Sequence, residues 1–284
     1  AGKKLGKRVV TMLPGSNLPI RHLTLPKMPP KELNEAVRWE SKRHLSYSLD
    51  DAVIEYLIQD DERKVAGDKY DVLFVAAERT AVLEHLAPFD RAGIKVEAVD
   101  AHPLALRNAF RLREGPADKS VLVADLGAGG TEIDVFRGGG LLFSRSIEFG
   151  GNSATHALAA EMEIRPDEAE AIKTQTNVAT AADGDRPAAI IRKGLDSILR
   201  EIRRSAEYFR TAFREKPVEM FILTGGCALT PGIREYFSRS LAGTVELDSP
   251  FAGLFVPPSV AAEFGPVSAR FSAAVGAALR KPPG

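Results

Sequence analysis

The sequence predicts an α/β fold, and three observations carry that prediction. Apolar runs typical of strands alternate with amphipathic runs typical of helices along most of the chain. Between residues 20 and 100 these runs follow the order β-α-β-β-α-β, which is the pattern of a compact ferredoxin-like unit. An apolar run that ends in a glycine-rich turn occurs twice, at residues 121–130 and 218–226.

Length and composition set the outer limits. With 284 residues, the chain can form one large domain or two medium ones. It has 44% hydrophobic and 27% charged residues, as soluble globular proteins do. The 38 basic and 38 acidic residues cancel, so no general attraction to nucleic acid or to an acidic membrane surface is expected.

Three further features predict a cytoplasmic protein that does not insert directly into a membrane. The single cysteine, Cys227, excludes an internal disulfide framework and fits a reducing compartment. No apolar run approaches the roughly 18–20 residues that span a bilayer. Residues 1–10 are basic but lack the apolar core of a signal peptide.

The first hundred residues contain strand and helix signals in a clear order. Strands are expected at residues 7–14, 20–26, 52–60, 70–78 and 94–100, with a charged loop at 61–69. A helix is expected at 29–45, with prolines at its start. Another is expected at 80–93, from Thr80 to Gly93, and Pro88 should kink or shorten it.

The rest of the chain continues the alternation. A helix at 105–115 leads into a buried strand at 120–126, and the residues 131–136 alternate as a second strand. Helices are expected from Gly150–Asn152 to residue 162, from 165 to 175, from 190 to 213 and from 231 to 243. A small, polar loop covers 176–188, and a buried strand covers 218–226.

The turn after the strand at 120–126 carries the first chemical signal. Asp125 ends the strand, and Gly127, Gly129 and Gly130 follow without side chains. Glycines permit positive φ angles and let backbone N–H groups approach an anion closely. An acid beside phosphates makes sense if a hydrated Mg²⁺ lies between them. The alternative is a tight hairpin turn that merely needs glycine.

Two later motifs strengthen the phosphate interpretation. Gly225 and Gly226 end the second apolar strand, where α/β sheets commonly bind ligands. Glu170 and Lys173 lie three residues apart on one predicted helix face. Taken alone, that pair is more typical of a solvated surface ion pair.

Taken in order, these three motifs resemble those of the actin, Hsp70 and sugar-kinase superfamily, in which they hold ATP. The resemblance narrows to the PilM family of FtsA-like type IV pilus assembly proteins. It rests on Pro14, Ser16 and Arg21, on the segment LPKMP at 25–29 and on RWE at 38–40, and it covers nearly the whole chain. It implies an actin-like (ribonuclease H-like) ATPase fold with an FtsA-like inserted subdomain of β-α-β-β-α-β order.

The resemblance also implies a set of site residues. Asp125 would hold Mg²⁺ through water, residues 127–131 would line the phosphates, Glu170 and Lys173 would face the ribose and adenine, and Gly225 and Gly226 would face the adenosine. The expected nucleotide-binding residues are Asp125, Gly127, Ala128, Gly129, Gly130, Thr131, Gly151, Asn152, Glu170, Lys173, Gly225, Gly226 and Cys227.

The implied subdomains follow the actin plan. Residues 1–19 and 99–119 would belong to subdomain 1A, and residues 20–98 would form the inserted 1C-type subdomain. Residues 120–151 and 217–284 would form subdomain 2A, and residues 152–216 would form subdomain 2B.

The function implied is that of a cytoplasmic nucleotide-binding scaffold, held at the inner membrane by its partners. The groove beside the inserted subdomain would receive the cytoplasmic N-terminal peptide of PilN, and other pilus inner-membrane proteins would also bind. Self-association stays open. No residue is convincing as an activated catalytic base, so no catalytic residue is assigned and hydrolysis of ATP is expected to be weak or absent.

One departure from the family pattern concerns the start of the chain. The family begins with a phosphate-1 hairpin, another acid-glycine turn, and residues 1–20 contain no acid to fill that role. The sequence is therefore expected to be a truncated or processed form, or to do without that loop. Either case should weaken nucleotide binding.

Two other functions are alternatives. An FtsA-like division protein would form filaments and anchor through a C-terminal amphipathic helix, whereas this sequence ends in AALRKPPG. A sugar or acetate kinase would need a carboxylate base from its first domain. The inserted unit and the missing first loop argue against the kinase.

Three single features favour structural roles. Cys227 is expected to be a small buried filler rather than a nucleophile. The helix at 190–213 places apolar residues on one side and arginines on the other, which favours core packing over a membrane-surface helix. Trp39, the only tryptophan, is expected to pack, with a partner groove as the alternative.

Overall fold

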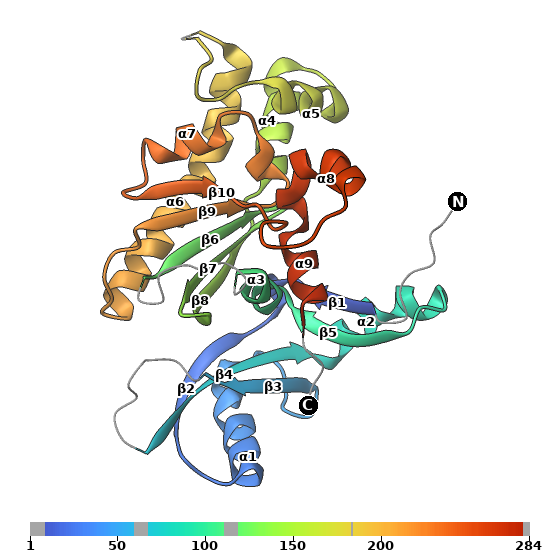
Figure 1. The fold of residues 1–284 in the computed structure, drawn as a ribbon, viewed down its shortest axis with the longest axis vertical. Coiled ribbons are helices and arrows are strands. Elements are labelled where there is room, and N and C mark those ends of the chain that lie inside the picture. The colour runs from blue at the N-terminus through green and yellow to red at the C-terminus, as the bar shows by residue number, and fades with distance from the viewer. Residues whose placement is uncertain (1–8, 60–67, 111–118, 183, 281–284) are drawn as a thin grey trace.

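A computed structural model describes residues 9–59, 68–110, 119–182 and 184–280 (Figure 1). The strands are β1 Val9–Leu13, β2 Ile20–Pro26, β3 Ala52–Ile58, β4 Lys69–Glu78, β5 Val96–Ala101, β6 Val121–Leu126, β7 Thr131–Arg137, β8 Gly140–Ile147, β9 Met220–Thr224 and β10 Thr244–Leu247. The helices are α1 Pro30–Ser41, α2 Arg79–Arg91, α3 His102–Phe110, α4 Gly151–Met162, α5 Pro166–Gln175, α6 Arg186–Ala212, α7 Ile233–Ser238, α8 Pro258–Phe264 and α9 Ser272–Ala278. Short 3-10 turns occupy Gly15–Asn17, Lys42–His44, Cys227–Leu229 and Gly265–Phe271.

A five-stranded sheet of order β10-β9-β6-β7-β8 forms the body of the molecule. Strands β10, β9 and β6 are parallel, and β6, β7 and β8 form an antiparallel meander. The two apolar strands recognised in the sequence, β6 and β9, are neighbours in register, with Asp125 opposite Thr224. Both glycine turns therefore leave the same edge of the sheet.

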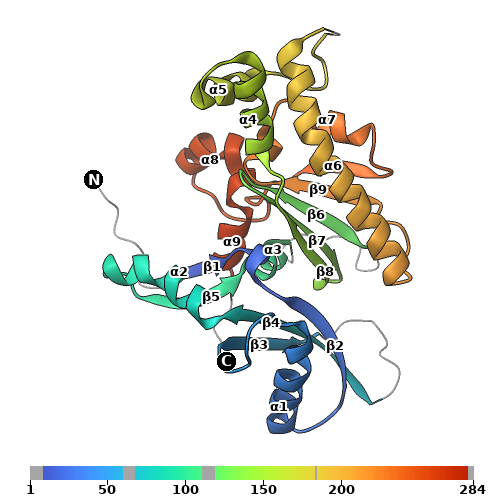
Figure 2. The ribbon, with the colours of Figure 1, turned by 180° about the vertical axis from the view of Figure 1, so that it is seen from behind.

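Helices cover both faces of this sheet. The alternating residues Leu122, Ala124 and Leu126 of β6 belong to the core formed with α4 and α6, and Figure 2 shows α6 in front of the sheet. Val123 faces the other side and joins a second core that includes Leu106 of α3. Because strand side chains alternate between faces, one strand contributes to both cores.

Helix α6 shows why the amphipathic pattern favoured packing. Its apolar side, including Ile198, Ile202 and Phe209, is buried in the core. Asp185 caps its first turn by accepting a hydrogen bond from the Ala188 N–H at 2.9 Å. Among the described parts of the chain, no helix has the length and apolar content needed to cross a membrane.

The unit between residues 20 and 100 keeps the predicted element order but divides its strands between two sheets. Strands β2, β4 and β3 form an antiparallel sheet, and α1 packs Leu33 and Val37 against it. The fourth strand, β5, instead pairs in parallel with β1. The expected single ferredoxin-like sheet is therefore wrong, because β5 finds its hydrogen-bond partner outside the unit.

Two polar side chains connect this three-stranded sheet to the body. His22 Nε2 and Gln59 Nε2 each lie 2.9 Å from the Leu141 carbonyl oxygen on β8. His22 Nδ1 lies 3.0 Å from Asp71 Oδ1, which orients the ring. These bonds fix where β2 and β3 meet the larger sheet.

Several sequence predictions differ in detail from the structure. Helix α2 begins at Arg79 without a side-chain cap, so Thr80 does not open it. The helix continues through Pro88 to Arg91 and ends before Gly93, whose φ is +67°. Helix α7 has only six residues, because the chain turns after Ser238.

Four elements were not assigned from the sequence: β8, β10, α8 and α9. Other predictions lie partly outside the described residues, namely the strand start at 7–8, the charged loop at 61–67 and the helix end at 111–115.

Trp39 does not pack in the core: it is 66% exposed, and Lys42 Nζ lies 5.4 Å from its ring centre.

The contact between α3 and α9 supplies a test of the fold. A Cβ atom at Gly276 would overlap the Ala105 carbonyl oxygen, whereas a Cβ at Gly265 would meet nothing within 4 Å. We expect Gly276→Ala to lower the free energy of unfolding by about 1–3 kcal/mol, because the two helices must move apart. Gly265→Ala is the control and should change it by less than about 0.5 kcal/mol. Urea unfolding of both variants measures the difference; equal stabilities would contradict the close packing.

Candidate functional site

The turn between β6 and β7 is a hairpin closed by its own backbone. The Gly127 N–H donates to the Gly130 carbonyl oxygen at 3.0 Å. Contrary to expectation, none of the three glycines of the turn has a positive φ. Gly127 and Gly130 are needed for close approach instead, because a Cβ on either would come within 2.8 Å of a backbone oxygen.

The start of α4 packs directly on this hairpin. The N–H groups of Gly151 and Asn152 donate to the carbonyl oxygens of Gly127 and Ala128 at 2.9 and 2.8 Å. A Cβ on Gly150 would come within 2.7 Å of the Gly130 nitrogen. Thr131 is buried and donates its hydroxyl to the Phe149 carbonyl at 2.8 Å, so that hydroxyl proton is engaged within the protein.

Asp125 lies between two elements that the sequence placed far apart. Its Oδ2 is 3.0 Å from His102 Nε2 at the start of α3. On the other side, a Cβ at Gly225 would overlap Asp125 Oδ1. Gly225 has a φ of +85°, and its N–H donates to the Ala269 carbonyl at 2.9 Å. Only glycine fits this backbone position beside the carboxylate.

The surroundings of Asp125 shift two pKa values. Burial by itself would lower the pKa of His102, but the hydrogen bond to Asp125 and the nearby carboxylate charges raise it above its usual value. Asp134 on β7 is fully buried, and neither of its oxygens makes a hydrogen bond of normal geometry among the described residues. Burial first, and repulsion from Glu132 second, raise the pKa of Asp134 to about 8.

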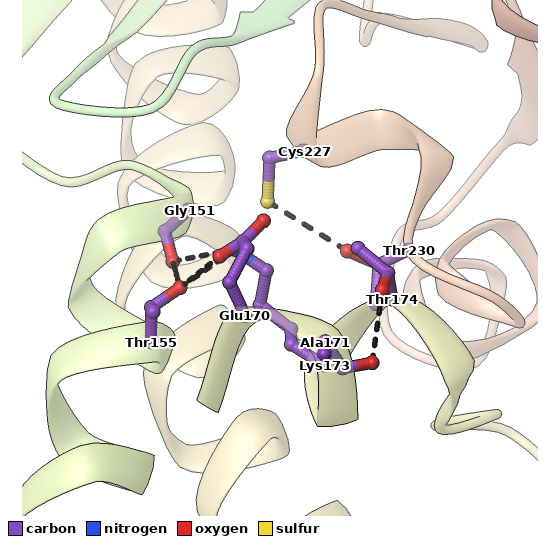
Figure 3. Close-up of polar contacts among 8 residues, drawn as sticks. All are labelled: Gly151, Thr155, Glu170, Ala171, Lys173, Thr174, Cys227 and Thr230. Carbon is purple, nitrogen blue, oxygen red and sulfur yellow. Dashed lines mark hydrogen bonds and ion pairs between the residues drawn. The ribbon is translucent and has the colours of Figure 1, made fainter. Parts of the chain in front are cut away.

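A second cluster forms around Lys173, as Figure 3 shows. Lys173 Nζ donates to Glu170 Oε2 at 2.6 Å, to the Thr155 hydroxyl at 2.8 Å and to the Gly151 carbonyl at 3.2 Å. Lys173 is only 5% exposed. The pair with Glu170 is therefore not the solvated surface pair that its spacing alone suggested.

The ionisation of this cluster follows from its hydrogen bonds. Burial would raise the pKa of Glu170, but its hydrogen bonds with Lys173 and Thr155 and the positive charges nearby lower it overall. About half of the Glu170 side chain remains exposed, so one face of the pair is open to solvent. The cluster thus holds a fixed ammonium group with an accessible carboxylate beside it.

Cys227 completes the cluster as a packing residue. A Cβ at Gly151 would lie 3.2 Å from the Cys227 Cβ and 3.3 Å from Lys173 Nζ. The thiol is buried, and that burial raises the pKa of Cys227. A raised pKa leaves little thiolate, which agrees with the expectation of a filler rather than a nucleophile.

The structure thus brings the sequence-predicted residues into two adjacent clusters joined by the start of α4. Three residues in contact with them were not predicted: His102, Thr155 and Arg270, whose side chain lies 4.0 Å from the position of a Cβ on Gly226. Thr155 follows Gly151 by one helical turn, which is a signal the sequence did contain. Within the described residues, no three His, Cys, Asp or Glu side chains are grouped to hold a metal directly.

A separate groove lies between the three-stranded sheet and the body. This cavity of about 990 Å³ is bounded by β3, β4 and α2 on one side and by β5, α3 and the end of α9 on the other. Its walls are mainly apolar, with Leu57, Val75 and Val82 facing Val99 and Leu104. The charged residues Glu55, Asp100, Arg107 and Arg280 also line it.

The mixed five-stranded sheet, with helices on both faces and a three-stranded unit attached, defines an actin-like fold. Two solved actin-like structures support this at low sequence identity. MreB5 of Spiroplasma citri bound to AMPPNP matches with a TM-score of 0.50 and 12% identity, over 71% of this chain and 63% of that chain. The MamK double helical filament matches with a TM-score of 0.51 and 16% identity, over 72% and 65%.

The family is shown by a model that covers almost the entire chain. The model of the type IV pilus assembly protein PilM matches residues 2–282, so the chain belongs to the PilM family. A chain of the solved PilM-PilN type IV pilus biogenesis complex superposes with a TM-score of 0.84 and 29% identity, over 97% of this chain and 80% of that chain.

Cell division protein FtsA is a more distant relative. The Bacillus subtilis protein is 27% identical over 213 residues, 67% of this chain and 48% of FtsA. The Neisseria meningitidis protein is 29% identical over 219 residues, 66% of this chain and 52% of FtsA. The chain thus spans about half the length of these curated relatives.

Asp134 supplies a test of the electrostatics near the site. Its raised pKa means that the folded state disfavours the charged carboxyl. That cost is absent below the ordinary value of 3.8 and grows as the pH rises towards about 8. We therefore expect Asp134→Asn to gain stability over the parent through this window, by at most about 1.4 kcal/mol per pH unit.

Thermal unfolding at several pH values between acid and pH 8 measures this gain. The exposed Asp90→Asn is the control and should show no such trend. A parent and an Asp134→Asn variant that differ by the same amount at every pH would contradict the buried, protonated state of Asp134.

Proposed function

We propose that this protein is an actin-like, nucleotide-binding scaffold of the type IV pilus inner-membrane assembly complex, and that it binds the cytoplasmic N-terminal peptide of PilN. The observation that carries the proposal is the apolar groove between the three-stranded sheet and the body, in a chain of the PilM family. An extended segment in such a groove gains affinity from backbone hydrogen bonds and a few side-chain pockets. The protein would then stay at the inner membrane through its partner.

The subdomain division remains part of this proposal. Residues 20–98 would form the inserted unit, which the separate sheet of β2, β4 and β3 supports. Residues 120–151 and 217–284 would form subdomain 2A, which the shared sheet of β6 to β10 supports. Residues 152–216, which include α5 and α6 and nearly all of α4, would make up subdomain 2B, and residues 1–19 and 99–119 would make up subdomain 1A.

ATP with Mg²⁺ is the ligand proposed for the two clusters. Asp125 stands at the carboxyl end of β6 beside the bare backbone of Gly225, a position suited to a hydrated cation. The half-exposed Glu170, oriented by buried Lys173, would accept hydrogen bonds from ribose hydroxyls. Mg²⁺ would supply neutralisation of phosphate charge when bound. No described side chain is arranged as an activated base, so we propose weak or absent hydrolysis.

The remaining residues have roles proposed from the resemblance to the actin, Hsp70 and sugar-kinase superfamily. Residues Gly127 to Thr131, Gly151 and Asn152 would lie against the phosphates, and Gly225, Gly226 and Cys227 against the adenosine. The N–H groups of Gly151 and Asn152 already donate to the hairpin. These two residues would therefore act by leaving room for the ligand and by holding the hairpin in place.

Calorimetry with ATP, with and without Mg²⁺, tests the nucleotide site. Asp125→Asn should remove the Mg²⁺-dependent part of the affinity, because the carboxamide keeps the shape but loses the charge that holds the hydrated ion. The exposed Asp90→Asn should bind as the parent does. Equal Mg²⁺-dependent affinities in the parent and Asp125→Asn would refute this role.

Two neighbouring residues of α2 test the peptide groove. Val82 lines the groove, whereas Leu83 is 60% exposed and does not line it. A synthetic peptide of the PilN cytoplasmic terminus should bind the parent and Leu83→Glu alike. Val82→Glu should weaken binding at least about tenfold, since a buried charge costs more than 1.4 kcal/mol.

Fluorescence anisotropy with the labelled peptide measures both variants, and circular dichroism checks that both are folded. If the peptide binds neither the parent nor Leu83→Glu, the PilN proposal fails. If Val82→Glu binds as the parent does, the peptide uses another surface.

A further inference from the structure

A second groove shares no lining residue with the one proposed for PilN and has a different chemistry. This cavity of about 800 Å³ runs along the C-terminal half of α6, between that helix and residues 217–221 and 240–242. Its floor is apolar, because Val218, Phe221 and Leu241 line it and are themselves buried in the core. In Figure 2 this end of α6 lies at the far end of the helix from α4 and α5.

Arginines dominate the rim of this groove. Arg200, Arg203, Arg204 and Arg210 project from α6, and Arg145 projects from β8. The spacing of the four α6 arginines places them on the solvent side of the helix, opposite the buried Ile198, Ile202 and Phe209. Glu207 is the only acid among the residues that line the groove. We call this surface the arginine groove.

The ion pairs of these arginines leave part of the charge uncompensated. Arg145 and Arg204 share Glu201 at 2.9 and 2.7 Å. Arg210 pairs with Glu207, and Arg200 donates to the Ser197 hydroxyl at 2.9 Å. Arg203 makes no hydrogen bond or ion pair with another residue in the described ranges. Arg200 and Arg203 therefore present guanidinium donors without an acidic partner there.

This concentration of charge stands out because the whole chain is neutral. Core packing requires only the apolar side of α6 and does not explain why the exposed side carries arginine in particular. Arginine matches carboxylates with two parallel hydrogen bonds, and it stays charged at every physiological pH. Behind the guanidinium groups lies an apolar floor, so a ligand that fits needs both carboxylates and an apolar side chain.

We propose that the arginine groove docks an acidic segment of a partner protein, with carboxylates paired to Arg200 and Arg203 and an apolar side chain over Val218, Phe221 and Leu241. A polypeptide segment fits better than a bilayer, because the apolar surface is recessed behind the arginines rather than projecting from them. The groove is separate from the one proposed for PilN, so both partners can bind at once.

A labelled synthetic peptide in which glutamates alternate with leucines is the probe. Anisotropy with the full chain should show binding that weakens as salt rises, because ion pairs at the rim are screened. The double variant Arg200→Glu/Arg203→Glu should weaken binding at least about tenfold. The control Arg43→Glu/Arg234→Glu makes the same change in net charge at exposed sites outside the groove and should bind within about twofold of the parent.

Three further measurements decide between the proposal and its rivals. The same peptide with lysine in place of glutamate should not bind. Phosphatidylglycerol vesicles should not sediment the protein, and size-exclusion chromatography should show no self-association that Arg200→Glu/Arg203→Glu abolishes. Any one of four results would overturn the proposal. These are equal loss in both double variants, binding of the lysine peptide, vesicle binding that depends on Arg200 and Arg203, and self-association that depends on the same two arginines. Val82→Glu should leave binding of this peptide intact. A failure of the present proposal can therefore be told apart from a failure of the PilN proposal.

Discussion

The parallel pairing of β6 with β9 is the constraint on which the rest of the structure depends. These strands are separated by almost a hundred residues, and their register places Asp125 opposite Thr224. Because both strands run in the same direction, their glycine turns emerge at one edge of the sheet. Gly225 then meets the Asp125 carboxylate, and it can do so only without a side chain.

The same pairing determines where the helices go. The meander β6-β7-β8 extends the sheet on one side, and α4 starts on the hairpin between β6 and β7 through two backbone hydrogen bonds. That start carries Gly151 next to Lys173 of α5 and Cys227 beyond β9. The β6–β7 hairpin, helices α4 and α5, and the glycine turn after β9 are therefore held together in one arrangement. A ligand across them would contact both halves of the molecule.

The two grooves occupy different parts of this framework. The first depends on the junction between the three-stranded sheet and the body, which His22 and Gln59 hold through one carbonyl oxygen. The second depends only on α6 and the sheet it covers. One groove is mainly apolar and the other is edged by arginines, so the two proposed ligands differ in chemistry. A neutral chain with two such surfaces suits a protein that brings partners together.

The sequence by itself determined the class of fold, the order of most elements and the identity of many of the residues at the proposed site. Strand alternation and helical periodicity are local properties, and a cluster of glycines after an apolar run marks a turn. It did not reveal β10 or α9, because a four-residue strand and a helix of small residues carry almost no periodicity.

Only the tertiary structure decided the long-range partners. In the structure β5 pairs with β1 and not with the strands of the expected ferredoxin-like unit, because a strand pairs with whichever free edge the fold presents. It buried Lys173, whose spacing from Glu170 is equally typical of a surface pair, and it placed His102 against Asp125. It also showed that Gly127 and Gly130 of the hairpin serve close approach rather than positive φ. Burial and contact depend on the whole chain, so no local pattern encodes them.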